Sequence, residues 1–412
     1  MSDAEHTNPG RELSGQGAGH PDTRSFKHLF RRFIEADPRR LHFAAHSHHY
    51  WPDVTFEAQE RAWLDAARFA DYKWGPIFEE TLPRARQHIA RILGLSDPGT
   101  LAFAVNTHEL VTRIVSCFPE GMRLRVLTSN SEFHSFTRQS RRWEESGKIE
   151  CTRISTQPFD TFGERVAERV GSGEYDLVYL SQVFFDSGFV FEGLWDLVLS
   201  IPSRTWVVID GYHGFMALPT NLHSVESRCF YLAGGYKYAM SGEGACFVHC
   251  PPSYGPRPAN TGWFAGFGSL ATGLGTEQVP YAQDGFRFFG ATFDPSGLYR
   301  FNAVMDLLVR EGVGVDLIHE RVRNLQQELL DRLPPGIEGL ERDCLLPGAA
   351  WSGERGNFLT FESDRARAIH DRLREAGVVT DYRGNRLRIG FGLYHDPTDV
   401  DELCRRIDQT LR

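Results

Sequence analysis

The feature that most limits the possible folds is an alternation of short apolar segments with segments of helical periodicity. The apolar segments have no polar face, which is typical of strands in a parallel sheet covered by helices on both sides. We therefore predict an α/β fold with a mainly parallel sheet. The predicted strands lie at 101–106, 123–130, 175–185 and 204–211, and the predicted helices at 83–95, 107–118, 134–146 and 194–202. Thr107, a favoured N-cap residue, is expected to cap the second helix.

Polar motifs follow the predicted strands where each strand ends. Ligands of open α/β sheets bind at the carboxyl ends of the strands, so these motifs are expected to meet at one edge. A further strand-like segment, CFYLAGGYK, runs directly into Lys237 and adds to the same edge. The motifs are Asn106-Thr107-His108, the segment 129–135, Ser181-Gln182 and Asp210-Gly211-Tyr212-His213.

The chemistry of these groups indicates a cofactor. Backbone N–H groups of Thr107 and His108 at the start of a helix suit a phosphate. A buried Asp210 would need a cationic partner. Lys237 lies among glycines and tyrosines, where burial would lower its pKa and leave free amine to act as a nucleophile. A phosphate, a cationic ring nitrogen and an amine-reactive aldehyde together describe pyridoxal 5'-phosphate.

Each residue also has an interpretation without a cofactor. Lys237 can be an ordinary surface lysine, and Asp210 can belong to a turn-forming Asp-Gly pair. His213 can be a buried histidine whose hydrogen bonds are satisfied within the protein. Phe133 can be part of the core.

The run VVIDGYHG, followed downstream by GGYKY, resembles the class V branch of the fold-type I pyridoxal-phosphate enzymes, and within it kynureninase. The motifs NTHEL, SEFHS, FFGAT and RLRIGFGLYHDPTDVDEL extend this resemblance over roughly residues 40–412. The resemblance implies an aspartate aminotransferase-like fold with a large cofactor-binding domain and a smaller α+β domain.

The resemblance also assigns roles to the residues at the strand ends. Lys237 is similar to the lysine that forms a Schiff base with the cofactor and later moves protons at the substrate α-carbon. Asp210 resembles the carboxylate that keeps the pyridine nitrogen protonated. His213 resembles the group beside the ring oxygen or the phosphate. Thr107 and His108 match the helix start that holds the phosphate.

Further roles follow from the same resemblance. Phe133 matches a ring that stacks on the cofactor, and Tyr236 matches a tyrosine directed at the phosphate. Thr292 matches a residue lent across a dimer interface. Arg388 matches the arginine that binds the substrate α-carboxylate, a task suited to a planar guanidinium. Arg386 lies on the same face of the strand and is the alternative.

The histidine-rich run at 41–53 is expected to lie over the mouth of the active site, as the N-terminal segment does in this family. We assign His46 to substrate binding, together with Trp263, whose TGWF motif resembles a family tryptophan motif. Two imidazoles, those of His46 and His48, are also a possible start of a metal site. No third ligand has a recognisable spacing, so no metal is predicted.

Several departures from kynureninase argue against kynurenine as the substrate. The chain has AAHSHHYW where kynureninases have a Gly-Asn-Ser-Leu-Gly motif, and Phe136 where they have a second aspartate. Gly290-Ala291-Thr292 replaces an Asn-Pro motif. Cysteine desulfurase, another class V activity, is disfavoured because Cys344 fits the position of a nucleophilic cysteine poorly.

Three functions stay open from the sequence. The favoured one is an enzyme that cleaves or substitutes a bond at the β-carbon of an amino acid, a kynureninase-like lyase or hydrolase. The alternative is a class V aminotransferase that passes the amino group to a keto acid. The third is a non-catalytic cofactor-binding regulator. It has little support, because such proteins usually carry a DNA-binding module and this chain has neither room for one before residue 26 nor a basic face.

The organisation and partners complete the expectation. We predict a disordered lead at 1–25, the segment over the active-site mouth at 26–60, the large domain at 61–296 and the small domain at 297–412. The net charge of −9 and a pI near 6.0 exclude a basic nucleic-acid footprint. No apolar run is long enough for a membrane span, and the lead lacks the apolar core of a signal peptide. Seven scattered cysteines fit a reducing cytoplasm. We expect a cytoplasmic homodimer with active sites at the interface, acting on a small amino acid.

Overall fold

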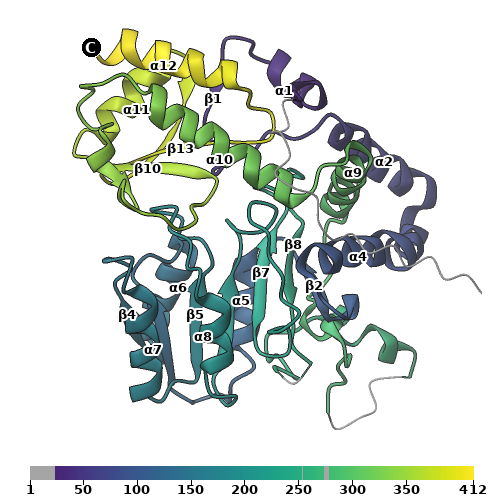
Figure 1. The fold of residues 1–412 in the computed structure, drawn as a ribbon. Helices are drawn as coiled ribbons and strands as arrows, with labels where there is room; N and C mark the ends of the chain where they lie inside the picture. The colour runs from purple at the N-terminus through teal and green to yellow at the C-terminus, as the bar shows by residue number, and fades with distance from the viewer. Residues whose placement is uncertain (1–23, 253, 273–277) are drawn as a thin grey trace, which may run out of the picture.

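A computed structural model describes residues 24–252, 254–272 and 278–412. A large sheet with its helices forms the lower, teal part of Figure 1, and the C-terminal elements in green and yellow lie above it. The N-terminal segment in purple runs along the upper side and joins the C-terminal part through a short strand. No helix in the described ranges combines the length and apolarity needed to cross a membrane.

The large sheet has seven strands in the order β2-β8-β7-β6-β5-β3-β4. The five strands from β7 to β4 pair in parallel, and β8 runs antiparallel to both of its neighbours. The prediction of an α/β fold with a mainly parallel sheet is therefore confirmed. The strands are β2 (Leu101–Ala104), β3 (Leu124–Ser129), β4 (Ile149–Ile154), β5 (Leu177–Ser181), β6 (Trp206–Asp210), β7 (Phe230–Gly234) and β8 (Cys246–His249).

Burial explains why these segments carry so few polar residues. Every residue of β2, β5, β7 and β8 is buried, so neither face of these strands meets water. Such strands cannot show the alternation of a half-exposed sheet. The apolar runs in the sequence are a direct result of cover on both faces.

The helices follow the amphipathic segments of the sequence. Helix α4 ends at Leu93 and is followed by Gly94, whose φ of 65° is the left-handed conformation that favours glycine. Helix α5 begins at Thr107, but its N-cap is Asn106, whose side chain accepts a hydrogen bond from the backbone N–H of Glu109 at 2.9 Å. The expectation that Thr107 caps this helix is wrong, because the helix begins at Thr107 and the side-chain oxygen of Asn106, one residue earlier, accepts the capping hydrogen bond. The helices are α1 (Arg31–Glu35), α2 (Val54–Phe69), α3 (Trp74–Pro76), α4 (Leu82–Leu93), α5 (Thr107–Val115), α6 (His134–Glu145), α7 (Phe162–Ser172), α8 (Leu194–Ser200), α9 (Ser296–Glu311), α10 (Val315–Arg332), α11 (Ala366–Glu375) and α12 (Pro397–Leu411).

The C-terminal part has its own sheet and core. Its strands are ordered β12-β13-β10-β9, and a separate parallel pair joins β1 to β11. Most of the buried residues of α10, α11 and α12 pack in this second core, whereas α9 packs in the core of the large sheet. The domain boundaries given above stay predictions. The strands are β1 (Leu41–His42), β9 (Leu345–Leu346), β10 (Phe358–Glu362), β11 (Val378–Val379), β12 (Asp381–Arg383) and β13 (Arg386–Gly390).

Candidate functional site

A cavity of about 660 Å³ lies where β2, β5, β6 and β7 end. Cavities of this size suit small ligands and cofactors. Polar strand ends form its floor, and β12 and β13 of the C-terminal sheet contribute two arginines. The lining of the cavity includes Ser47, Asn106, Thr107, His108, Phe133, Ser181, Phe185, Asp210, His213, Tyr236, Lys237, Cys246, Arg383 and Arg388.

Lys237 follows β7 and lines this cavity. Its ammonium group donates a hydrogen bond to the backbone carbonyl of His46, which anchors the lysine to the N-terminal segment. Burial, followed by the positive charge of Arg388, lowers the pKa of Lys237 to about 7, although the charges of Asp381 and Asp210 oppose the change. A substantial fraction of the amine is therefore free at neutral pH, as a nucleophile or base requires.

Asp210, the last residue of β6, is 9% exposed. One carboxylate oxygen accepts a hydrogen bond from the backbone N–H of Tyr212 at 3.0 Å, and the other accepts from the hydroxyl of Tyr179 at 2.9 Å. Burial raises the pKa of Asp210, while these hydrogen bonds and the charge of Lys237 oppose the rise. None of the hydrogen-bond donors is cationic, so a cationic group in the cavity would stabilise this carboxylate.

The support beneath Asp210 is aromatic. Phe136 stacks on Tyr179 with ring centroids 3.6 Å apart and ring planes 4° apart. Phe136 is 5% exposed, so it has a packing role here. Through Tyr179, this stack fixes the position of the hydroxyl that binds Asp210.

Glu132 is a second buried carboxyl group at the strand ends, which the sequence argument missed. It accepts hydrogen bonds from the hydroxyls of Ser129 at 2.6 Å and Ser181 at 2.5 Å. Burial, with a smaller contribution from the charge of Asp210, raises the pKa of Glu132 to about 8, although the hydrogen bonds from Ser129 and Ser181 oppose the rise. The available signal was a glutamate that follows two serines, Ser129 and Ser131, directly after a buried strand.

The N-terminus of α5 opens onto the cavity. The first N–H groups of a helix have no partner within it and carry the positive end of the helix dipole. Thr107 and His108 both line the cavity, as does the capping residue Asn106. This helix start is suited to an anion such as a phosphate.

Arg388 lies in β13 and is 3% exposed. Its guanidinium donates to the backbone carbonyl of Phe185 at 2.6 Å and to the carboxylate of Asp381. The alternative, Arg386, binds Asp186 at 2.6 Å and Glu362 at 3.0 Å and does not line the cavity. Of the two arginines on this face, only Arg388 reaches the site.

The remaining predicted residues divide into two groups. Phe133 and Tyr236 line the cavity, and Phe133 is 41% exposed, so its side chain is accessible to a ligand. His213 lines it as well, and the buried Nδ1 of His213 has no hydrogen-bond partner among the described residues. The ring of His46 is fully buried against Phe358 and is not part of the lining.

Trp263 and Thr292 are exposed and lie outside the cavity lining of this single chain. Their roles stay predictions that depend on a second copy of the chain. Cys344 is also outside the lining, whereas Cys246 lines the cavity and burial raises the pKa of its thiol to about 11. Across the described ranges, His, Cys, Asp and Glu form no group of three or more that could hold a metal ion.

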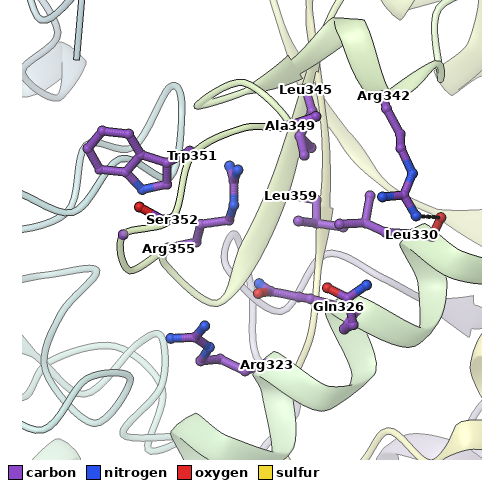
Figure 2. A pocket seen from close by; sticks show the side chains of 12 residues that line it. Arg323, Gln326, Leu330, Arg342, Leu345, Ala349, Trp351, Ser352, Arg355 and Leu359 are labelled. Carbon is purple, nitrogen blue, oxygen red and sulfur yellow. Dashed lines mark hydrogen bonds between the residues drawn. The ribbon is translucent and has the colours of Figure 1, made fainter. Parts of the chain in front are cut away.

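A smaller cavity of about 150 Å³ lies in the C-terminal part and is lined by three arginines, as Figure 2 shows. Each of these arginines already donates to protein oxygens. Arg323 binds Glu354, Arg342 binds Asp331 at 2.9 Å, and Arg355 binds the carbonyls of Pro347 and Gly348. This pocket contains no lysine or acidic group in its lining, so the chemistry concentrates in the larger cavity.

No protein-family model matches the chain, and no curated protein matches its sequence. Solved structures match it closely in shape. A cystine C–S lyase in complex with its product, cysteine persulfide, has a TM-score of 0.76 and 16% identity, covering 90% of this chain and 98% of that one. A mutant of the same lyase, with glycine covalently linked to its PLP cofactor, has a TM-score of 0.77 and 17% identity. The match covers 93% of this chain and 99% of that one.

A cysteine desulfurase from Thermococcus onnurineus NA1 has a TM-score of 0.75 and 14% identity, covering 95% of this chain and 99% of that one. At these identities the comparisons show the fold alone. The chain has the fold of these proteins over nearly its whole length, as the resemblance to fold-type I enzymes implied.

Proposed function

We propose that the chain is a pyridoxal-phosphate-dependent enzyme that cleaves a bond at the β-carbon of an amino acid. The observation that carries the proposal is the meeting of four features in one cavity: Lys237, Asp210, the start of α5 and Arg388. The cystine C–S lyase and cysteine desulfurase named above share this fold, and their names describe chemistry at the same carbon. The kynureninase-like motifs point to the same carbon, while the pocket residues that differ argue against kynurenine.

The residues of this chain fit the cofactor. The N-terminus of α5 would hold its phosphate, and Phe133 offers an exposed ring to stack on its plane. Asp210, buried without a cationic hydrogen-bond donor, would hold a protonated ring nitrogen. The unpartnered Nδ1 of His213 offers a further polar contact. Lys237 provides the amine for covalent attachment.

When bound, pyridoxal phosphate supplies an electron sink for the electron pair left at the substrate α-carbon. Arg388 binds the α-carboxylate and fixes the orientation of the substrate. The amine of Lys237, with its pKa near 7, takes the proton from the α-carbon. The leaving group departs from the β-carbon with its bonding electrons. For a sulfur-linked substrate one water is consumed, and a 2-keto acid, ammonium and the thiol are released.

The positions of the cysteines favour cleavage without a protein thiol. Cys344 is outside the cavity, and the thiol of Cys246 is held protonated at neutral pH by burial. Neither is suited to act as a nucleophile towards sulfur in the substrate. We therefore propose direct elimination at the β-carbon, and we expect Cys344→Ser to keep full activity.

The test begins with borohydride reduction of the protein loaded with pyridoxal phosphate. Peptide mass spectrometry should find the reduced adduct on Lys237, and Lys237→Ala should lose it while the exposed Lys148→Ala keeps it. Reaction with a panel of amino acids that carry a leaving group on the β-carbon, including cystine, should then release a 2-keto acid without an amino acceptor. Kynurenine, whose cleavage would release alanine instead of a 2-keto acid, should not be cleaved. Absence of the Lys237 adduct contradicts the cofactor assignment. A strict need for an added keto acid indicates an aminotransferase instead.

A further inference from the structure

Asp381 is the closest ionic partner of Arg388, and the sequence argument did not single it out. The two residues lie directly opposite each other in the antiparallel pairing of β12 with β13. The guanidinium of Arg388 donates to one carboxylate oxygen of Asp381. Asp381 is 8% exposed, so the pair is shielded from water and geometrically fixed.

A second arginine binds the other oxygen of the same carboxylate. Arg383 lies two residues beyond Asp381 on β12, and its guanidinium lies 2.9 Å from that oxygen. The side chain of Arg383 is 45% exposed, and it lines the cavity together with Arg388. Besides this ion pair, its one hydrogen bond among the described residues goes to the backbone carbonyl of Tyr382, so part of its guanidinium is free for a ligand.

The third neighbour of Asp381 is His46, whose ring does not carry a charge that would neutralise the carboxylate. The Nε2 of His46 lies 3.8 Å from the carboxylate, but burial, followed by the charges of Arg388 and Lys237, lowers the pKa of His46 well below its ordinary value. His46 is therefore neutral at physiological pH. Two guanidinium groups and one carboxylate remain, and together they carry one positive charge.

The hydrogen bonds of Arg388 define which of its edges is free. One terminal nitrogen is held by the carbonyl of Phe185 and the other by Asp381, while the buried Nε has no partner in the part of the chain that the structure describes. A guanidinium held at both terminal nitrogens cannot rotate away from the cavity. It presents the remaining N–H groups in one orientation to an incoming carboxylate.

We propose that Asp381 and Arg383 complete the carboxylate site of this enzyme: Asp381 positions Arg388, and Arg383 supplies the charge that one substrate carboxylate neutralises. The inference rests on the proposed function and deepens it. Without Arg383, the pair of Arg388 and Asp381 is neutral and has no net positive charge to attract a substrate carboxylate. Without Asp381, the site gains positive charge but Arg388 loses its fixed orientation.

These two roles give opposite expectations for one variant. If charge alone mattered, Asp381→Asn would strengthen binding of a carboxylate because a negative neighbour is removed. If Asp381 positions Arg388, the same variant weakens it. The amide has nearly the shape of the carboxylate and keeps one oxygen to accept a hydrogen bond. We therefore expect the variant to fold like the wild type.

The experiment compares the binding of L-alanine with that of L-alaninamide, which lacks the carboxylate. Calorimetry is done on protein loaded with pyridoxal phosphate whose Lys237 adduct has been verified. We expect the wild type to prefer alanine, and Asp381→Asn and Arg383→Gln each to reduce that preference roughly 10-fold to 100-fold, the range of a hydrogen bond to a charged group. Arg383→Lys should restore most of the loss, and the exposed Arg367→Gln should match the wild type.

An unchanged or stronger preference in Asp381→Asn overturns the positioning role. An unchanged preference in Arg383→Gln overturns the role of the second arginine. Because both variants must first show the Lys237 adduct, a general loss of folding is excluded before binding is measured. A wild type without the adduct overturns the proposed function itself.

Discussion

We predict that the buried His395 makes the folded protein less stable in mild acid. Replacing this histidine should make that loss of stability smaller. The ring is 2% exposed and stacks on Phe43 with centroids 4.3 Å apart. Its Nδ1 accepts a hydrogen bond from the backbone N–H of Gly392 at 2.8 Å, so the proton lies on Nε2, which donates to the carbonyl of His42 at 2.6 Å. Protonation of Nδ1 would replace the acceptor that Gly392 needs.

The size of the effect follows from the pKa. Burial lowers the pKa of His395 from 6.5 to about 4. Because the folded pKa lies below the unfolded one, the stabilisation is complete above about pH 6.5 and is lost as the pH falls towards 4. Between about pH 7 and pH 5.5 the unfolded chain takes up most of a proton at this site and the folded chain does not. The free energy of unfolding should therefore fall by about 1 kcal/mol through this one residue.

The assay is urea unfolding of the wild type and His395→Gln at both pH values. The variant is expected to be less stable at pH 7 because the stacked ring is lost. Its further loss of stability on acidification should be about 1 kcal/mol smaller than that of the wild type. His28→Gln, at an exposed position, serves as the control and should follow the wild type. Equal losses in the wild type and His395→Gln would refute the reasoning.

Three further predictions concern the site and its support. Asp210→Asn should lower kcat roughly 100-fold or more, as loss of one preorganised charge does in other enzymes, and steady-state kinetics of the loaded protein would show it. Phe136→Ala removes the ring stacked on Tyr179 and should destabilise the fold by about 3–5 kcal/mol in urea unfolding; a loss below about 1 kcal/mol would contradict the packing role. Gly390→Ala would place a methyl group 2.0 Å from Nδ1 of His46, so we expect a lower melting temperature, and an unchanged one would show that His46 moves freely.

The proposed function rests on the geometry of a cavity rather than on sequence identity. The solved structures with the same fold share 14% to 17% of their residues with this chain, so their reactions cannot be transferred directly. The chain itself has the lysine, the buried carboxylate, the helix start and the arginine within one cavity. It also has phenylalanine at 133 and 185 in the lining, which makes part of the wall aromatic. The proposed substrate class follows from these residues, and the panel of amino acids would identify its members.

The sequence determined the sheet and the edge on which the site lies. Strands that are apolar on both faces must be packed against helices on both sides of the sheet. This requirement follows from the residues of each strand alone, without reference to any other segment. The polar motifs directly after these strands must then lie at the carboxyl edge. Lys237 and Asp210 were found this way because a lysine among glycines and an aspartate after a buried strand are conspicuous locally.

Only the tertiary structure decided which side chains meet. Arg386 and Arg388 share one face of β13, and the choice between them depends on what lies opposite: Asp186 and Glu362 in one case, the cavity wall in the other. Asp381 became visible as the partner of Arg388 only through the strand register. Strand periodicity specifies the face of each side chain, but register and long-range packing bring partners from other segments to that face. That is why the elements could be read from the chain and the ionic pairs could not.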